Sequence, residues 1–221
     1  MKLNTKEVAE LQPDYLGFIF WERSIRFFDG EIPVLPSGIH KIGVFVDASV
    51  KEILDKVEKY NLQAVQLHGT ESPEFCNELR IGSSKIRARS STIHVRSSAV
   101  ETSLAETNLK IIKVFSIKDD FDFSVLKSYE EVCDYYLFDT KGKFPGGNGY
   151  SFDWNILENY PSTKPYFLSG GIGLEDADAI KEFMQRPESK YCYALDVNSR
   201  FEIEAGLKDV ARLKGLREKL K

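Results

Sequence analysis

A repeated alternation between short apolar runs and amphipathic stretches constrains the fold of this chain more than any other feature. Seven short apolar runs each end in a polar or glycine-containing turn, after which apolar side chains recur every three or four positions. Such runs are typical of strands buried on both faces, and the wider spacing indicates helices that pack against them. The runs lie at residues 15–20, 41–46, 64–67, 110–117, 134–138, 166–168 and 193–197. This order predicts a parallel sheet with helices outside it.

The length of the chain selects one architecture among those with a parallel sheet. A (β/α)8 barrel has about 250 residues, with about 200 near its lower limit. The 221 residues here, 42% of them hydrophobic, can fill a single core. We therefore expect one α/β domain over residues 1–221 with the (β/α)8 TIM barrel fold. The chain opens on a predicted helix capped by Asn4, not on a strand, so we expect such a barrel to lack its first β-strand.

Residues 82–108 interrupt the alternation, because they are rich in Ser, Thr and Arg and contain few apolar side chains. We expect a polar insertion or a mobile loop at about these positions. The alternating pattern at residues 91–96 leaves a marginal extra strand as an alternative. We interpret the arginines of this stretch as a solvated face and not as a polyanion site, because the whole chain is acidic.

Charge and composition exclude several classes of function. A net charge of −4 gives no reason to expect nucleic acid or an anionic membrane as a partner, and no apolar run is long enough to cross a bilayer. The first residues do not resemble a signal peptide. Neither the cysteines nor the histidines show the spacing of metal ligands, so we expect no metal. An odd, sparse set of cysteines fits reduced thiols in a cytoplasmic protein.

Two strand–turn–helix units near the end of the chain are suited to bind an anion. In the first, the strand at 166–168 is followed by the turn 169–171 and by a predicted helix from Leu174. Adjacent glycines let backbone N–H groups approach an anion, and the start of a helix adds partial positive charge. The second unit has its turn at 198–200. Taken alone, the glycines can equally serve only to turn the chain, but two neighbouring turns predict a phosphate held between them.

The carboxyl ends of the predicted strands carry the polar side chains expected of an active site. Asp139 is a candidate general acid or base, or alternatively caps the glycine-rich loop at 142–149. Arg26 can grip a carboxylate of a substrate or form a surface ion pair, and His68 can contact the substrate or serve the fold. We interpret Asp47 as a helix cap and the glycine-rich loop as a lid over the site.

Several ordered segments at these strand ends carry a resemblance to a known family. They are Leu16-Gly-Phe-Ile-Phe with Ser24-Ile-Arg26, Val65-Gln-Leu-His-Gly69, Phe138-Asp-Thr with Gly146-Gly-Asn-Gly149, Leu168-Ser-Gly-Gly171 and Leu195-Asp-Val-Asn-Ser-Arg200. Together they resemble phosphoribosylanthranilate isomerase from about Leu16 to the C-terminal helix. Each segment alone is a weak signal, but their order at barrel strand ends is specific.

The resemblance implies a (β/α)8 barrel of tryptophan biosynthesis that needs no cofactor. The implied reaction is the Amadori rearrangement of N-(5-phosphoribosyl)anthranilate to 1-(2-carboxyphenylamino)-1-deoxyribulose 5-phosphate. Asp139 would be the general acid that protonates the ribose ring oxygen, and Arg26 would hold the anthranilate carboxylate. The other expected substrate-binding residues are His68, Gly170, Gly171, Asp196, Asn198 and Ser199, with the two glycines, Asn198 and Ser199 on the phosphate. The expected partner is thus a phosphorylated small molecule, bound by a monomer or a homodimer.

The chain departs from the family pattern at the base. The family removes the C2 proton with a cysteine at the end of its first strand, in a Cys-Gly-Met-Arg/Lys segment of which this sequence matches only Met1-Lys2. None of Cys76, Cys133 and Cys192 lies where it can replace that base. We therefore expect that the chain starts too late, through a misassigned start codon, and that it turns over little substrate.

Two other functions fit part of the pattern. A noncatalytic phosphosugar-binding barrel would keep the anion turns and lack the base. A different phosphate-binding barrel isomerase or synthase, of histidine or indole synthesis, would need other acid–base residues at the strand ends. Arg26 together with Val65-Gln-Leu-His-Gly69 argues against that second alternative.

Overall fold

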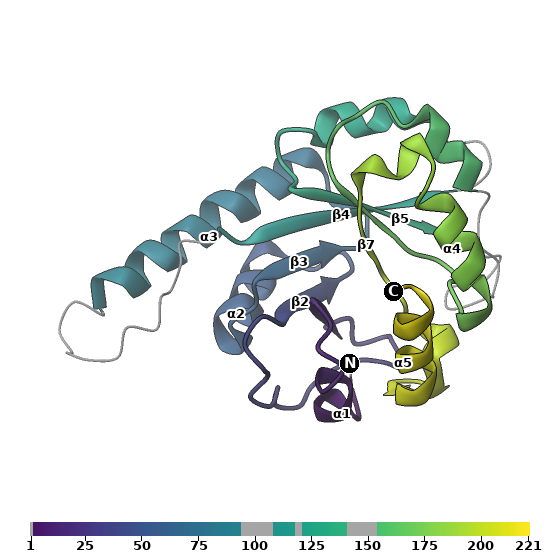
Figure 1. Cartoon of the computed structure of the whole chain (residues 1–221). Coiled ribbons are helices and arrows are strands. Elements are labelled where there is room, and N and C mark those ends of the chain that lie inside the picture. The colour runs from purple at the N-terminus through teal and green to yellow at the C-terminus, as the bar shows by residue number, and fades with distance from the viewer. Residues whose placement is uncertain (1, 94–107, 118–120, 141–153) are drawn as a thin grey trace.

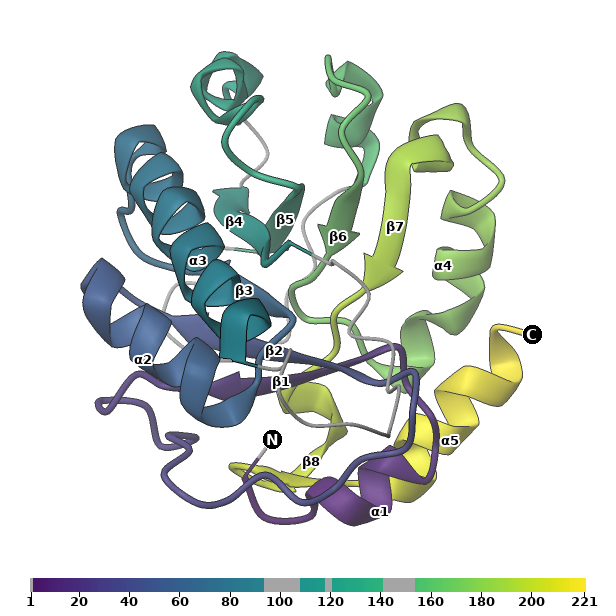
Figure 2. The same ribbon diagram turned by 90° about the vertical axis from the view of Figure 1, so that its left-hand side faces the viewer.

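A curled sheet of parallel strands organises the chain. The computed structural model describes residues 2–93, 108–117, 121–140 and 154–221. Within these ranges, seven parallel strands form one sheet in sequence order, which confirms the predicted strands and their direction. They are β1 (Tyr15–Ile19), β2 (His40–Phe45), β3 (Ala64–Leu67), β4 (Lys110–Ile117), β5 (Tyr135–Thr140), β6 (Tyr166–Leu168) and β7 (Cys192–Leu195). The sheet curls as in a TIM barrel and carries its helices outside (Figures 1 and 2).

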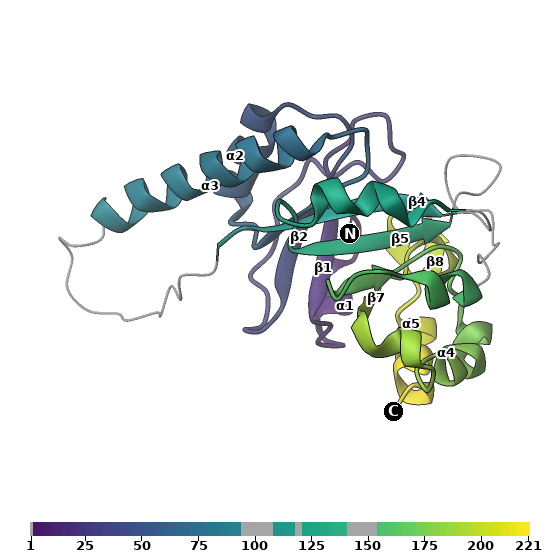
Figure 3. The ribbon, with the colours of Figure 1, turned by 90° about the horizontal axis from the view of Figure 1, so that it is seen from above.

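Helices cover the outer face of the sheet, with α2 and α3 on one side and α4 and α5 on the other (Figure 3). The α-helices are α1 (Thr5–Ala9), α2 (Val50–Tyr60), α3 (Pro73–Ile93), α4 (Ala177–Phe183) and α5 (Val210–Lys219). Short 3-10 helices complete the set: η2 (Phe123–Tyr129), η3 (Trp154–Asn159), η4 (Leu174–Asp176), η5 (Pro187–Tyr191) and η6 (Ser199–Phe201). None of the helices in the described ranges is long and apolar enough to span a bilayer.

The long helix α3 corrects the loop that we expected from Gly82. The helix continues through Gly82 to Ile93, so the strand suggested at 91–96 is wrong for residues 91–93. A Cβ at Gly82 would lie 2.6 Å from Leu54 Cδ1 of α2, so the glycine permits close helix packing and does not end α3. The hydroxyl of Ser83 donates to Arg80 O over 2.9 Å, which satisfies a polar side chain within the helix. Residues 94–107 lie outside the described residues, and the polar insertion as a whole stays a prediction.

The core has an inner and an outer layer. The outer layer lies between the sheet and its helices, and Leu67, Phe138 and Ile53 of α2 all belong to this buried cluster. A separate apolar cluster fills the other face of the curled sheet, its interior. Its buried members are Ile42, Ala64, Ile112, Val114, Leu137 and Phe167, with Tyr15, Tyr135 and Ala194 packed against them. Side chains of alternate residues share a face, so this inner layer fixes which later residues point into the barrel.

The first and last strands of the sheet approach each other through side chains. No backbone ladder joins β1 and β7 in the described part of the chain. Tyr15 Oη of β1 lies 3.2 Å from Tyr193 Oη of β7, and the Tyr15 ring packs 5.5 Å from that of Phe167. The sheet is therefore curled to near closure, while its edges lack the hydrogen bonds of a closed barrel.

A small hairpin that the sequence did not reveal ties the two ends of the chain together. The strands β8 (Glu202–Glu204) and β9 (Leu207–Lys208) pair antiparallel, and the last helix begins after them at Val210. Leu3 N donates to Gly206 O over 3.0 Å. Asn4 holds the N-cap position of α1 as predicted, but its side chain makes no capping hydrogen bond and instead accepts from Lys208 N over 3.0 Å. Figure 2 shows α1, β8 and α5 gathered in one place.

A buried ion pair fixes the loops that follow β2 and β3. Lys113 Nζ lies 2.9 Å from Glu71 Oε2, and their side chains are 4% and 2% exposed. Glu71 also accepts from Asp47 N over 2.9 Å, and Lys113 donates to Gly69 O over 2.8 Å. Asp47 itself accepts from Thr70 N, so it joins the two loops and does not cap α2, as we had interpreted it. The cap of α2 is Ser49, which accepts from Glu52 N.

Replacement of Glu71 by alanine should destabilise the fold strongly. The Glu71→Ala variant leaves the ammonium of Lys113 buried and unpaired, which costs about 3–5 kcal/mol. The matched control is Asp55→Ala, because the Lys51–Asp55 pair is 85% and 61% exposed and should contribute nothing measurable. Urea denaturation compares the two free energies of unfolding. Equal losses in both variants would show that burial of the Lys113–Glu71 pair does not matter.

Candidate active site

The predicted acid lies at the carboxyl end of a strand and faces the interior. Alternate residues share a face, so Asp139 follows the inner-layer residue Leu137 of β5, and Asp196 follows Ala194 of β7. Asp139 is half-buried and lies opposite Ser116 in the β4–β5 register. The polar end of the barrel interior is therefore continuous with its apolar core.

Backbone hydrogen bonds set three strand ends side by side. Ser169 N donates to Phe138 O over 2.9 Å, and Asp196 N donates to Leu168 O over 2.8 Å. The ends of β5, β6 and β7 therefore follow one another along one rim. This brings Asp139 and both predicted anion turns to the same edge of the sheet.

The turns after β6 and β7 are in direct contact. Gly170 and Gly171 have φ values of 96° and 67°, a region that residues with side chains rarely adopt. Arg200, in the turn after β7, donates from Nη1 to Gly171 O over 3.1 Å and forms an ion pair with Glu175. The structure thus places the turn 169–171 against the turn 198–200. The guanidinium of Arg200 makes this contact.

A buried glutamine links two predicted substrate-binding residues. Gln66 of β3 is 5% exposed. Its Nε2 donates to Asp196 Oδ2 over 3.2 Å, and its Oε1 lies 2.6 Å from His68 Nε2. Because the amide nitrogen faces the carboxylate, the amide oxygen accepts from His68, which fixes the imidazole tautomer with its proton on Nε2. Sequence reasoning missed Gln66, although a lone amide in the apolar strand 64–67 was its signal.

The imidazole of His68 is neutral at physiological pH. Burial lowers its pKa to about 4, although the negative charge of Asp196 acts in the opposite direction. Repulsion by Lys113 contributes to this lowered value. A neutral imidazole held in this way can take part in hydrogen bonds without adding a positive charge to the site.

Arg26 is held in a buried ion pair. Its Nε lies 2.8 Å from Glu202 Oε2, and its Nη2 lies 2.6 Å from the same oxygen. The side chains of Arg26 and Glu202 are 19% and 5% exposed, so this is not the surface ion pair that we weighed from the sequence. Glu202 is the first residue of β8 and lies two residues after the turn 198–200. Arg26 is thereby tied to the segment that carries the second anion turn.

The three cysteines of the chain lie away from this rim. Cys76 and Cys133 are buried behind the sheet, where a hydrogen bond from the Cys133 thiol lowers the pKa of Cys76. Cys192 is the first residue of β7, at the opposite end from the rim, and burial raises its pKa to about 12. None of the three offers a thiolate at the strand ends that carry Asp139 and the predicted anion turns.

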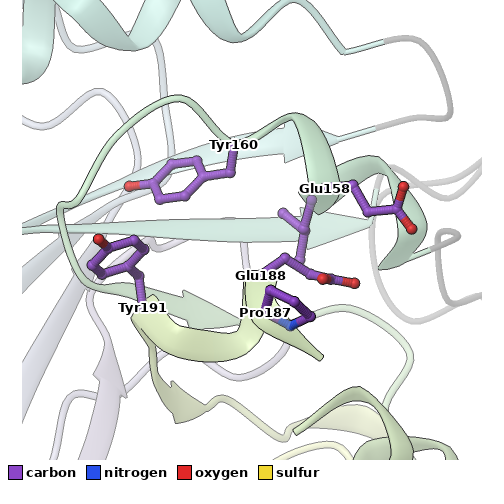
Figure 4. Close-up of a pocket in the computed structure, with 6 residues that line it drawn as sticks. Glu158, Tyr160, Pro187, Glu188 and Tyr191 are labelled. Carbon is purple, nitrogen blue, oxygen red and sulfur yellow. The ribbon is translucent and has the colours of Figure 1, made fainter. Parts of the chain in front are cut away.

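A separate open pocket lies at the other end of the barrel. It has a volume of about 530 Å³ and is lined by Leu157, Glu158, Tyr160, Pro187, Glu188 and Tyr191. Figure 4 shows these residues, which belong to the segments that precede β6 and β7. The carboxylate of Glu188 lies 3.9 Å from Arg186 Nη1, so its charge is already paired. No residue that we predicted for the site lines this pocket, and the predicted lid at 142–149 lies outside the described residues.

Comparison with known proteins decides the family. The sequence model described as "N-(5'phosphoribosyl)anthranilate (PRA) isomerase" matches residues 2–101 and 92–219. The chain is 38% identical to the N-(5'-phosphoribosyl)anthranilate isomerase of Parabacteroides distasonis, over 96% of this chain and 85% of that protein. It belongs to the phosphoribosylanthranilate isomerase family. The resemblance drawn from the strand-end segments is confirmed, and with it an isomerase of tryptophan biosynthesis.

Further phosphoribosylanthranilate isomerases support the assignment in sequence and in fold. The enzyme of Phocaeicola vulgatus is 35% identical over 94% of this chain and 87% of its own length. The crystal structure from Thermotoga maritima superposes with a TM-score of 0.73 at 24% identity, over 100% of this chain and 95% of that one. One structure of the Thermotoga maritima enzyme describes it as dimeric. Another solved isomerase, with a TM-score of 0.67, holds reduced 1-(o-carboxyphenylamino)-1-deoxyribulose 5-phosphate.

The lowered pKa of His68 predicts that acid destabilises this isomerase fold. An unfolded chain binds a proton at His68 near pH 6.5, whereas the folded chain resists it until about pH 4. The stability that His68 contributes is therefore full above pH 6.5 and is lost as the pH falls toward 4. The loss is about 3 kcal/mol. Urea denaturation from about pH 7 to about pH 4.5 gives the free energy of unfolding at each pH, and this free energy should fall less with falling pH for His68→Asn than for the unmodified chain. Identical slopes would contradict the assignment of this effect to His68.

Proposed function

We propose that this chain catalyses the Amadori rearrangement of N-(5-phosphoribosyl)anthranilate. In this reaction Asp139 protonates the ribose ring oxygen, the C1–O bond breaks and the ring opens. Ring opening leaves a protonated imine between C1 and the anthranilate nitrogen, and a base then removes the proton from C2 to give an enolamine. The enol O–H loses its proton and C1 gains one, which gives the ketone of 1-(2-carboxyphenylamino)-1-deoxyribulose 5-phosphate. The single observation that carries the proposal is the position of Asp139 on one rim with two adjoining anion turns. No cofactor enters this scheme.

The phosphate of the substrate lies between the turns after β6 and β7 in this proposal. The positive φ values of Gly170 and Gly171 bring the backbone close to a ligand without a side chain in between. Asn198 and Ser199 precede and begin η6, on a segment that contacts the first turn through Arg200. Backbone N–H groups of both turns, with the nearby guanidinium, are the donors that a phosphate requires.

The other end of the substrate is anchored by Arg26 and the interior polar residues. The bonds from Arg26 to Glu202 use Nε and Nη2, which leaves Nη1 to reach the anthranilate carboxylate. His68, neutral and tied through Gln66 to Asp196, lines the interior beside the reacting ribose. Two anchored anionic ends hold the substrate so that its C1 and C2 lie near the acid, and such positioning accounts for a large part of catalysis.

Residues 1–221 place no cysteine where the base of this scheme is needed. We propose that the seven strands correspond to seven of the eight strands of a (β/α)8 barrel, and that the eighth would lie between β1 and β7. The base that the family supplies from that strand is a cysteine, and Cys76, Cys133 and Cys192 all lie elsewhere. The chain of 221 residues should therefore turn over the substrate slowly.

We place the protein in the cytoplasm, where its thiols stay reduced, as a monomer or a homodimer.

The positions of the cysteines also favour a second candidate function. A noncatalytic barrel that binds a phosphorylated sugar would keep the anion turns and Arg26 and would need no base. It predicts binding of the substrate or of its analogues without turnover. The experiment that tests the enzyme separates these two candidates.

The test adds a thiol at the open edge and measures turnover. An N-terminal extension that supplies one strand ending in a cysteine should raise kcat/KM by about 10²–10⁴-fold, measured as loss of phosphoribosylanthranilate fluorescence. The matched control is the same extension with serine in place of that cysteine, which restores the strand without the base. The substitution Asp139→Asn in the cysteine-bearing form should abolish the increase in kcat/KM.

Each outcome of this test has a defined meaning. Equal activity with cysteine and serine would contradict a thiol base. Full activity of Asp139→Asn would contradict the assigned acid. Tight binding of the substrate without turnover in every form would overturn the enzyme in favour of the noncatalytic barrel.

A further inference from the structure

A chain of buried polar contacts joins the two ends of the proposed substrate site. Glu202 accepts from Arg26 Nη2 over 2.6 Å at one oxygen and from Lys208 Nζ over 3.1 Å at the other. Lys208 Nζ also donates to Asn198 Oδ1 over 2.6 Å and to Asn198 O over 2.9 Å. The path Arg26–Glu202–Lys208–Asn198 therefore runs from the proposed carboxylate anchor to the proposed phosphate turn. We call it the anchor network.

Every donor of Lys208 is used inside the protein. An ammonium has three N–H donors, and Lys208 meets three acceptors, two on Asn198 and one on Glu202. Its side chain is 8% exposed. Lys208 is therefore not placed to bind a ligand itself. What it does is hold the backbone and side chain of Asn198 at a fixed place relative to Glu202.

Glu202 and Lys208 differ in how far their partners offset the effect of burial on their pKa values. Burial tends to raise the pKa of Glu202, but the hydrogen bond from Arg26 and the charge of Lys208 outweigh it and leave this pKa below its usual value. Burial lowers the pKa of Lys208, and the charge of Glu202 does not fully offset that effect. The ammonium thus gains less from the pair than it loses on burial. A buried pair is weak evidence for stability, and the geometry that this pair imposes explains it better.

We propose that Glu202 and Lys208 are positioning residues that set the separation and orientation of the two anion anchors. Glu202 fixes the plane of the Arg26 guanidinium, so that Nη1 points in one direction. Lys208 fixes the turn that carries Asn198 and Ser199. The inference rests on the proposed function, because the anchors are those of its substrate. Preorganised anchors reduce the entropy lost on binding and select ligands whose carboxylate and phosphate are correctly spaced.

A similar network at the other end of the barrel provides a control. Asp134 accepts from Arg80 over 3.0 Å and from Lys110 over 3.1 Å, so one carboxylate again holds one arginine and one lysine. It precedes β5, at the opposite end from Asp139. Asp134→Asn should therefore disturb a comparable ion-pair cluster without touching either anchor.

The experiment compares two ligands that differ only in the carboxylate. One is reduced 1-(o-carboxyphenylamino)-1-deoxyribulose 5-phosphate, and the other is the same molecule with an unsubstituted phenyl ring. Calorimetry gives both dissociation constants for the unmodified chain, Glu202→Gln and Asp134→Asn. The unmodified chain and Asp134→Asn should prefer the carboxylate ligand by about 10- to 100-fold, the value of one hydrogen bond between charged groups. Glu202→Gln should lose most of this preference.

The ratio of the two constants separates positioning from a merely structural role. A loss of overall stability lowers both affinities together and leaves their ratio unchanged. An unchanged ratio in Glu202→Gln would therefore overturn the inference. If the unmodified chain itself shows no preference, the role of Arg26 in the proposed function fails instead.

A second variant keeps the inference testable if Glu202→Gln does not fold. Lys208→Met removes the contacts to Asn198. The affinities for both calorimetry ligands and for inorganic phosphate should then fall by a similar factor of about 10-fold. Unchanged phosphate affinity in a folded Lys208→Met variant would overturn the proposed role of Lys208. Collapse of both variants, with Asp134→Asn intact, would show a structural role and also overturn it.

Discussion

Parallel pairing of β5, β6 and β7 is the constraint on which the site depends. Two backbone hydrogen bonds, from Ser169 N to Phe138 O and from Asp196 N to Leu168 O, fix how far each strand end lies along the rim. A slip of one residue would turn Asp139 or Asp196 away from the interior. The proposed acid and the proposed anion turns are therefore held by backbone geometry, and the side chains occupy the positions that this geometry defines.

Polar networks link separate strand ends of the rim through side-chain hydrogen bonds. Gln66 joins β3 to β7 through His68 and Asp196, and the anchor network joins Arg26 to the turn after β7. Each network is buried, where an unpaired group is costly, so each leaves its members few alternative positions. The apolar inner layer beneath them excludes water and ends where the polar residues begin. The fold thus combines an apolar packed interior with a charged rim at the strand ends.

Much of the fold could be predicted from the sequence, because strand-and-helix alternation is local. The seven strands and the full extent of α2 follow from apolar spacing alone. Gly82 misled the analysis, since a glycine that allows helices to touch looks the same in sequence as one that ends a helix. The candidate site residues could be named from the sequence as single strand-end positions, but the residues that contact them could not. Glu202 and Lys208 lie in a hairpin that is too short to show a pattern of alternating residues. The pair of Arg26 with Glu202 joins residues more than a hundred positions apart, so no local pattern predicts it.

The central claim is that the turns at 169–171 and 198–200 form one anion pocket beside Asp139. The most direct measurement is a titration of the ¹⁵N-labelled chain with inorganic phosphate, followed by the amide shifts of every residue. The account predicts that the largest saturable shifts belong to Gly170, Gly171 and Ser199, with a single dissociation constant for all three. Shifts that concentrate around Tyr160 and Tyr191 at the opposite end, or that give separate constants for the two turns, would contradict it.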